Sequence, residues 1–326
     1  MLFSNILSRL PFPVHNVVSC QEVIKYSNNN YLWRVVARTE EGDKVLFVKQ
    51  AGKLNKRAWQ EKHEKIYVAQ GRMDGEYTML TLLSTLWGKD YVPPVYFYDK
   101  AQHIMVMGEV GRGSTLLVEE FQQDHVHPEL GETLGMLLGK LHAATYKKKE
   151  DCCKSTAWRK LMHAFVSDWY LGIGILKYVP QDVVRAFWNE AQDAPRAWVW
   201  GDAVYRNILV GPGAHVAMVD FDHAFKFDPA FDGGVLLAHW MWMGEKNTKL
   251  HLESEQFVQN FWKGYGKEFE SRGLTAEVPA IKKRALRWAG QYLVSRTDGK
   301  SGSYFTQWPA WEKNIRELGI TLFLQK

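Results

Sequence analysis

The sequence predicts an α+β protein with two lobes, in which an antiparallel sheet with one helix precedes a mainly helical region. Residues 17–50 alternate apolar and polar side chains between turns, as half-buried strands do. Residues 74–87 and 132–144 repeat apolar side chains at helical spacing. The length of 326 residues suits about two domains of roughly 100–200 residues each, or one domain with two lobes.

The first lobe is expected to contain five strands and one amphipathic helix. Pro93 and Pro94 end the helix, because proline cannot continue it. The polar segment Lys53–Lys65 is expected to be an exposed loop or helix. The expected strands are Glu22–Tyr26, Tyr31–Arg38, Val45–Gln50, Val95–Asp99 and His103–Gly108, and the expected helix is Asp74–Trp87.

The second lobe is expected to be helical apart from one island of strands and turns at Ala197–Phe225. The change of pattern after Gly108 divides the chain into lobes of residues 1–109 and 110–326. The expected helices before the island are Glu132–Ala144, Ser155–Leu176 and Gln181–Gln192.

The composition indicates a globular protein rather than a disordered or membrane-spanning one. Apolar residues make up 46% and charged residues 24% of the chain, and the net charge of +5 is spread along it. Neither a nucleic-acid partner nor a membrane partner is indicated, and nothing in the sequence indicates an oligomeric state. Three cysteines, two of them adjacent, do not form a disulfide framework. Without a signal-peptide pattern, a cytoplasmic location is expected.

The island carries acidic residues in a pattern that suits phosphoryl transfer. A hydrophobic strand leads to Asp202, Asn207 follows five residues later, and a second strand leads to Asp220 and Asp222. Such a reaction needs a carboxylate that orients or deprotonates the acceptor hydroxyl, here Asp202, and oxygen ligands for Mg²⁺, here Asn207 and Asp220. The alternative is structural: Asp202 and Asn207 cap a turn, and the other two lie in an Asx turn.

This island resembles the aminoglycoside phosphotransferases and their relatives, the choline and methylthioribose kinases, which share the protein-kinase-like fold. Their catalytic loop reads His-Gly-Asp, then four residues and Asn, and their metal motif is Asp, an apolar residue and an acid. The chain has Trp200 where the family has His, a residue that supports the loop by packing and hydrogen bonding. The resemblance extends over about Val17–Phe261, and it implies that Asp232 caps the helix that follows it and braces the catalytic loop.

The resemblance implies that residues 1–109 bind ATP or GTP. Lys49, at the end of a strand, would contact the α- and β-phosphates, and Glu76 would hold it in an ion pair. Glu61 and Glu64 are less well placed for this pairing, since no apolar face follows them.

Two further segments of this lobe correspond to parts of the family's nucleotide site. Met107 and Glu109 would lie in the linker that meets the adenine edge, although a buried strand end explains them nearly as well. Asn28–Asn30 occupies the position of the phosphate-binding loop, where a plain hairpin turn is the favoured interpretation.

The predicted function is ATP- or GTP-dependent transfer of the γ-phosphate to a hydroxyl of a small molecule of the sugar, nucleoside or amino-alcohol type. The alternative is a nucleotide-binding pseudokinase or regulatory scaffold, which the substitution at Trp200 suggests. The basic residues after position 240 disfavour a polycationic acceptor, and we expect one or two of the tryptophans there to line the acceptor site. The basic residues are Lys282, Lys283, Arg284 and Arg287, and the tryptophans are Trp240, Trp242, Trp262, Trp288, Trp308 and Trp311.

Overall fold

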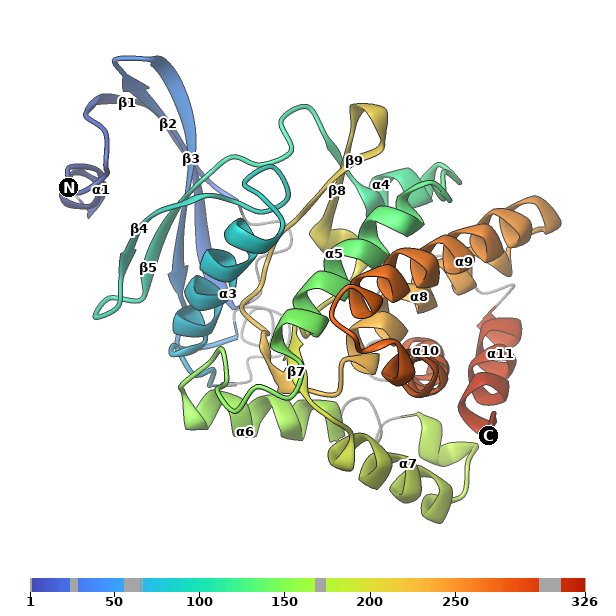
Figure 1. Ribbon diagram of the computed structural model, residues 1–326. Helices are drawn as coiled ribbons and strands as arrows, with labels where there is room; N and C mark the ends of the chain where they lie inside the picture. The colour runs from blue at the N-terminus through green and yellow to red at the C-terminus, as the bar shows by residue number, and fades with distance from the viewer. Residues whose placement is uncertain are drawn as a thin grey trace. The chain divides into compact units, whose positions relative to one another are not determined.

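A five-stranded antiparallel sheet forms the centre of the first of two units in the chain (Figure 1). The computed structural model describes residues 2–23, 29–55, 65, 67–167, 174–298 and 312–325. The first unit comprises Met1–Arg112 and Cys152–Arg159. The strands lie in the order β1-β2-β3-β5-β4, and their bounds are β1 Val14–Glu22, β2 Asn30–Thr39, β3 Gly42–Ala51, β4 Val95–Asp99 and β5 Ile104–Gly108.

The first strand differs from the expected one. Strand β1 covers Val14–Glu22 and pairs only with β2, so it lies at the edge of the sheet. Almost all of its residues are exposed, and exposure on both faces removes the alternation that identifies a strand. The expected strand at Glu22–Tyr26 therefore began too late, and residues 24–28 lie outside the described part of the chain.

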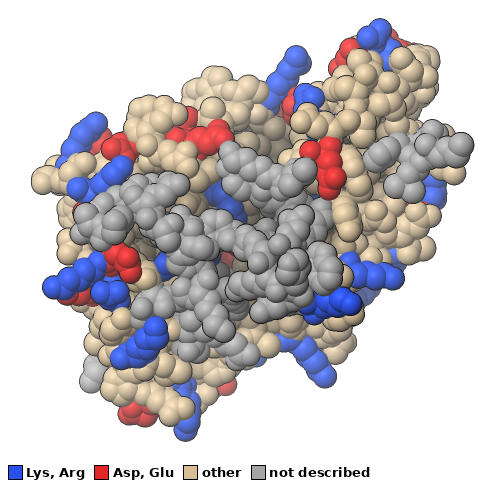
Figure 2. Space-filling model, turned by 180° about the vertical axis from the view of Figure 1, so that it is seen from behind, with Lys and Arg blue, Asp and Glu red and all other residues tan. Residues whose placement is uncertain are grey.

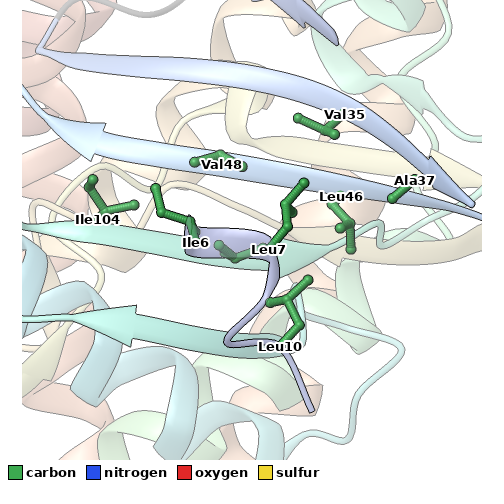
Figure 3. Close-up of a cluster of buried hydrophobic side chains, with 9 residues drawn as sticks. Ile6, Leu7, Leu10, Val35, Ala37, Leu46, Val48 and Ile104 are labelled. Carbon is green, nitrogen blue, oxygen red and sulfur yellow. The ribbon is translucent and has the colours of Figure 1, made fainter. Parts of the chain in front are cut away.

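Helices α1 and α3 pack against the sheet in the described part of this unit, and the sequence predicted one of them. Helix α3, Arg72–Leu86, is the expected helix and buries residues such as Met79 and Leu83. Helix α1, Leu2–Leu7, was not expected. It places Ile6 and Leu7 in the buried cluster shown in Figure 3, against residues of β2, β3 and β5. Burial of such side chains contributes about 1.5–3 kcal/mol each, which explains why so short a helix forms.

The second unit, Gly113–Asp151 and Lys160–Lys326, is mainly helical, as expected. Helices α5 and α9 approach so closely that a Cβ atom on Gly135 would lie 2.0 Å from the carbonyl oxygen of Phe261, so only glycine fits there. Helix α6, Thr156–Ala164, begins in the first unit and ends in the second. The other helices of the described part of this unit are α4 Leu117–Gln122, α5 Leu130–Thr145, α7 Gln181–Asp193, α8 Ala230–Gly244, α9 Thr248–Glu270, α10 Val278–Asp298 and α11 Glu312–Leu324, and its described 3₁₀ turns are Ile175–Lys177, Tyr205–Asn207, Pro212–Ala214 and Thr275–Glu277.

Five short strands interrupt the helices of this unit: β6 Thr115–Leu116, β7 Ala197–Val199, β8 Ile208–Gly211, β9 His215–Met218 and β10 Phe225–Phe227. Strand β8 pairs with β6 and β9, and β7 pairs with β10. These pairings bring the turn after β7 and the turn after β9 together.

The α+β class predicted from the sequence is confirmed. Basic and acidic side chains are intermixed over the face shown in Figure 2. Among the described helices, none is long and apolar enough to cross a membrane.

Candidate active site

Lys49 and Glu76 form a buried ion pair in the first unit. Lys49 lies on β3, between Leu32 of β2 and Met105 of β5, and Glu76 lies in the first half of α3. The Lys49 Nζ donates to Glu76 Oε1 at 2.7 Å, and the side chains are 7% and 2% exposed. The expected ion pair is therefore present. The candidates set aside in its favour, Glu61 and Glu64, lie outside the described residues.

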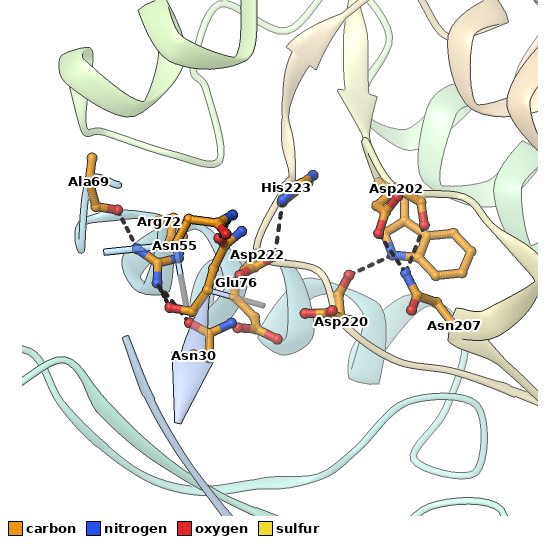
Figure 4. Close-up of polar contacts among 12 residues, drawn as sticks. Asn30, Asn55, Ala69, Arg72, Glu76, Asp202, Asn207, Asp220, Asp222 and His223 are labelled. Atoms are coloured by element: carbon orange, nitrogen blue, oxygen red, sulfur yellow. Dashed lines mark hydrogen bonds and ion pairs between the residues drawn. The ribbon is translucent and has the colours of Figure 1, made fainter. Parts of the chain in front are cut away.

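Arg72 is a structural residue of this unit that the sequence did not reveal. It is fully buried, and its guanidinium donates to the carbonyl oxygens of Ala69, Asn29 and Gly52 and to Asn30 Oδ1, at 2.5–3.1 Å (Figure 4). It thus joins the beginning of β2, the end of β3 and the beginning of α3. A single arginine before an apolar face gives no sequence signal for such a role. Asn28, the first residue of the expected turn, lies outside the described residues.

Met107 and Glu109 lie at the end of β5. Met107 is buried and pairs with Phe47 of β3 and Val95 of β4. Glu109 follows the strand and is exposed. This arrangement is a buried strand end, and contact of its backbone with a nucleotide base remains a prediction.

The turn after β7 is held by Asp232, which lies in the first turn of α8. Asp232 Oδ2 accepts from the backbone N–H of Trp200 at 2.6 Å, and Oδ1 accepts from that of Gly201 at 2.9 Å. Its Oδ2 also lies 3.1 Å from Nε2 of the buried His142. Gly201 has φ +82°, and a Cβ there would lie 2.2 Å from the carbonyl oxygen of His223. Only glycine fits at this point of the turn.

Asp232 was expected both to brace this turn and to cap α8, and the structure divides the two roles. Asp232 braces the turn, as described. The N-cap residue of α8 is Pro229, which has no side-chain cap, and the Oδ1 of the preceding Asp228 accepts from the backbone N–H of Ala230 at 3.1 Å. Its position just before the helix allows this contact, whereas Asp232 already lies inside the helix.

Asp202 and Asn207 contact one another across the same turn (Figure 4). Asn207 Nδ2 donates to Asp202 Oδ2 at 2.9 Å and to its carbonyl oxygen at 3.0 Å, and Arg206 Nη2 donates to Asp202 Oδ2 at 3.2 Å. Burial raises the pKa of Asp202, but the charges of Arg206 and His223 and these hydrogen bonds outweigh it, so the pKa lies below its usual value. Asp202 is therefore an ionised carboxylate at neutral pH.

Asp220 lies beside this pair because of the β8–β9 hairpin. The backbone N–H of Val219 donates to the carbonyl oxygen of Asn207 at 3.0 Å, which extends the hairpin pairing by one residue toward Asp220. Figure 4 shows Asp202, Asn207 and Asp220 gathered at this end of the hairpin. The structure thus brings together the three second-unit residues that the sequence pattern singled out.

Trp200 supports the backbone of Asp220. Asp220 has φ +62°, a left-handed conformation that is uncommon for a residue other than glycine. The indole Nε1 of Trp200 donates to the carbonyl oxygen of Asp220 at 3.0 Å, and its ring stacks on Phe221 at 5.1 Å. Trp200 is fully buried. The tryptophan, at the position where the family that the sequence resembles has histidine, therefore both packs and donates a hydrogen bond to the backbone of Asp220.

Asp222, the last acidic residue of the motif, is buried. Its Oδ1 lies 3.8 Å from Nε2 of His223, at the outer limit of an ion pair. The carboxylate therefore points toward a neighbouring residue of its own turn.

Two of the basic residues used to argue against a polycationic acceptor have structural roles. Arg284 donates to both carboxylate oxygens of Asp228 at 2.8 and 3.0 Å, in an ion pair that is almost completely buried. Arg287 donates to Glu190 and to the carbonyl oxygen of Phe323. Neither can be counted as free charge that selects an acceptor, so the sequence argument from these two residues was wrong.

The tryptophans from position 240 onward mostly belong to the core. The four of them that lie in described segments are buried, with exposed fractions of 0–8%: Trp240, Trp242, Trp262 and Trp288. The ring of Trp240, for example, stacks on Phe257 at a centroid distance of 3.5 Å. Trp308 and Trp311 lie outside the described residues. The concentration of tryptophan in this region is therefore explained first by packing between helices.

Comparison with known proteins agrees with this fold. The profile of the phosphotransferase enzyme family matches residues 34–277, which is more than half of the chain. Spectinomycin phosphotransferase APH(9)-Ia, solved with ADP and spectinomycin, aligns at 14% identity and a TM-score of 0.51, over 98% of this chain and 97% of its own.

Two solved kinases align at slightly lower TM-scores. Choline kinase LicA from Streptococcus pneumoniae is 16% identical at a TM-score of 0.49, over 99% of this chain and 97% of its own. A choline/ethanolamine kinase family protein from Mesorhizobium loti is 15% identical at a TM-score of 0.48, over 100% of this chain and 96% of its own. No curated protein sequence matches significantly. On the match of its sequence to the family profile, the chain belongs to the phosphotransferase enzyme family.

Proposed function

We propose that this phosphotransferase transfers the γ-phosphate of ATP or GTP to a hydroxyl group of a small molecule of the sugar, nucleoside or amino-alcohol type. Family membership makes the chain a phosphotransferase. The donor, the acceptor class and the roles of individual residues are our inference. The observation that carries it is the hydrogen-bonded pair of Asp202 and Asn207 beside Asp220.

Asp202 is the proposed catalytic residue. Its carboxylate is ionised at neutral pH, since its pKa lies below the usual value. Hydrogen bonds from Arg206 and Asn207 fix its orientation. An ionised, oriented carboxylate accepts a hydrogen bond from an acceptor hydroxyl and receives its proton as the phosphoryl group is transferred.

Asn207 and Asp220 are the proposed ligands of Mg²⁺, and the donor set fits this ion. The Nδ2 of Asn207 donates to two oxygens of Asp202, so the amide oxygen on the other side points away from Asp202. The carboxylate of Asp220 supplies a second, charged oxygen. Mg²⁺ prefers oxygen ligands and keeps sites for water and phosphate oxygens. When bound, the ion would neutralise charge on the transferring phosphates.

Lys49 is the proposed cation for the α- and β-phosphates. The ion pair with Glu76 holds its ammonium at a fixed position on β3, and a fixed cation stabilises phosphate charge without reorganising. The backbone of Met107–Glu109 is the proposed contact for the nucleotide base. These roles rest on the family resemblance together with the ion pair.

The test is ADP release over a panel of hydroxyl-bearing metabolites in the presence of Mg²⁺ and ATP or GTP. We expect Asp202→Ala to lower turnover by about 10²–10⁴-fold, the usual contribution of a positioned acid or base. Asp193→Asn, which changes an exposed aspartate at the end of α7, serves as the matched control and should retain full turnover.

Full turnover by correctly folded Asp202→Ala protein would overturn the assignment. Binding of Mg²⁺-nucleotide by the wild-type chain without turnover of any acceptor would instead favour the scaffold alternative. A thermal-shift measurement with nucleotide and Mg²⁺ separates the two cases, because it reports binding without chemistry.

A further inference from the structure

Two histidines and a glutamate converge at the end of α4, and the phosphotransferase site does not use them. Glu120 lies in the last turn of α4, and His125 and His127 lie in the segment that follows. Glu120 Oε2 is 3.1 Å from His125 Nδ1 and 3.1 Å from His127 Nε2. One ligand atom from each residue lies within 4.8 Å of the others.

Each of two residues is oriented by a further contact. The hydroxyl of Thr115 donates to Glu120 Oε1 at 2.6 Å, so the second oxygen, Oε2, is the one that faces the histidines. On the far side of its ring, His127 Nδ1 lies 3.0 Å from Glu129 Oε1. A carboxylate that receives the second ring N–H of a histidine is the usual partner of a metal-binding imidazole, since it fixes the tautomer.

His127 lies between two carboxylates, and a cation bound between its ring and one of them would stabilise this arrangement. A neutral imidazole carries one N–H, so it can donate to Glu129 or to Glu120 but not to both. If Nδ1 donates to Glu129, the lone pair of Nε2 faces the carboxylate of Glu120. Either a second proton or a metal ion between Nε2 and Oε2 removes this repulsion.

The segment that carries the histidines is held in place from outside. The indole Nε1 of Trp240 in α8 donates to the carbonyl oxygen of Val126 at 2.6 Å. The backbone N–H of His125 donates to the carbonyl oxygen of Glu120 at 3.0 Å, and Lys246 pairs with Asp124. The backbone of this segment is thus held by contacts that do not involve the three proposed ligand atoms.

We propose that Glu120, His125 and His127 bind a divalent transition-metal ion of the Zn²⁺ type, with water in the remaining position. Imidazole nitrogen and carboxylate oxygen are common Zn²⁺ ligands. Tetrahedral bonds of about 2.0–2.1 Å place neighbouring ligand atoms roughly 3.3 Å apart, close to the observed 3.1 Å separations. Mg²⁺ prefers oxygen ligands alone and does not suit this set. Binding would join the end of α4 to the segment that leads into α5.

The test is calorimetric titration of the full, nucleotide-free chain with Zn²⁺ in the presence of excess Mg²⁺. We expect one equivalent to bind to wild-type protein and equally to Asp220→Asn, which removes the proposed Mg²⁺ ligand. Persistence of binding in Asp220→Asn separates this site from the proposed function. The double variant His125→Gln/His127→Gln should lose the equivalent, and His251→Gln, which changes an exposed histidine on α9, should keep it.

Glu129→Gln provides a second, milder test. It does not remove a ligand, and replacing the carboxylate partner of a metal-bound histidine usually costs about 10–100-fold in affinity. We expect the Kd for Zn²⁺ to rise by this factor while the melting temperature of the metal-free chain stays unchanged. A purely structural contact would instead lower the melting temperature. Its result decides the proposal even if the double variant does not fold.

Two results would overturn the proposal. The first is the absence of Zn²⁺ binding by the wild-type chain, which would mean that the three side chains do not form a metal site. The second is equal binding by wild type and by folded His125→Gln/His127→Gln, which would show that the metal binds elsewhere on the chain.

Discussion

Lys49 and Glu76 in the first unit and the Asp202 group in the second are held in different ways. The first two residues lie inside a strand and a helix, and their side chains meet in the interior of the unit. Asp202 and Asp220 lie in turns between short strands, where Asp232 and Trp200 hold the backbone. Charged groups on regular elements are positioned by packing, whereas those in turns need dedicated hydrogen bonds.

This difference predicts where each region is vulnerable. In the first unit, removal of Lys49 or Glu76 breaks a buried ion pair, which is expensive in stability. In the second, removal of a hydrogen bond costs less stability but changes the geometry of the proposed site. The predictions below test this contrast, beginning with the largest expected effect.

Lys49→Met should lower the free energy of unfolding by about 3–5 kcal/mol, because it removes the buried cation that Glu76 contacts. Chemical denaturation measures the loss. The control is Lys44→Met on the same strand, whose half-exposed pair with Glu41 should cost no more than about 1 kcal/mol. The double variant Lys49→Met/Glu76→Leu should recover much of the stability. Similar losses for Lys44→Met and Lys49→Met would contradict the contrast.

Asp232→Asn should lower the free energy of unfolding by about 2–3 kcal/mol, since a charged acceptor of two backbone N–H groups becomes neutral. Hydrogen exchange of the Trp200 and Gly201 amides should accelerate more than that of the sheet in the first unit. Asp193→Asn is again the control. Unchanged exchange at these two amides would show that Asp232 does not hold the turn.

Acid should destabilise the second unit through His239, which is buried in α8. Burial, followed by the charge of Arg296, lowers its pKa to about 3. The unfolded chain, with a histidine pKa near 6.5, therefore binds a proton first as the pH falls. Stability should decrease from about pH 6.5 toward pH 3 by up to ~1.4 kcal/mol per pH unit.

The measurement for His239 is the difference in denaturation free energy between wild type and His239→Gln across this pH range. The difference removes the contribution of the carboxylates that titrate in both proteins. Since Nε2 of His239 contacts the Tyr292 hydroxyl at 3.1 Å, the glutamine variant can keep a polar contact there. Parallel pH profiles for the two proteins would exclude His239 as the acid-sensitive group.

Trp200→Phe should have the smallest effect on stability, about 0.5–1.5 kcal/mol from the lost N–H···O=C bond to Asp220. The phenyl ring keeps the stacking on Phe221. Because the hydrogen bond to the backbone of Asp220 is lost, turnover should fall several-fold and the KM for Mg²⁺-nucleotide should rise, while the KM for the acceptor stays constant. Trp200→His, which restores the family's residue, should retain a donor. A change in acceptor KM alone would argue against a role at the metal motif.

Regular elements with a buried face were predictable from the sequence, and elements without one were not. Helices α3 and α5 have apolar residues at helical spacing, and the structure contains both. Strand β1 is exposed along most of its length, so it lacks alternation. Helix α1 has only six residues, and its burial against the sheet is visible only when the distant strands are in place.

The sequence by itself indicated which residues are proposed to carry the chemistry. Asp202 and Asn207 lie five residues apart in the turn between β7 and β8, and Asp220 follows β9. Bracing of the turn by Asp232 was expected from the family resemblance, but the groups that it contacts, and the whole role of Arg72, were decided by the tertiary structure. Arg72 and Asp232 act through backbone groups of other segments, and a backbone carbonyl or amide has no sequence identity that would reveal its partner. Trp200 belongs with them, since the substitution was visible in the sequence but its hydrogen bond to Asp220 depends on how two turns meet.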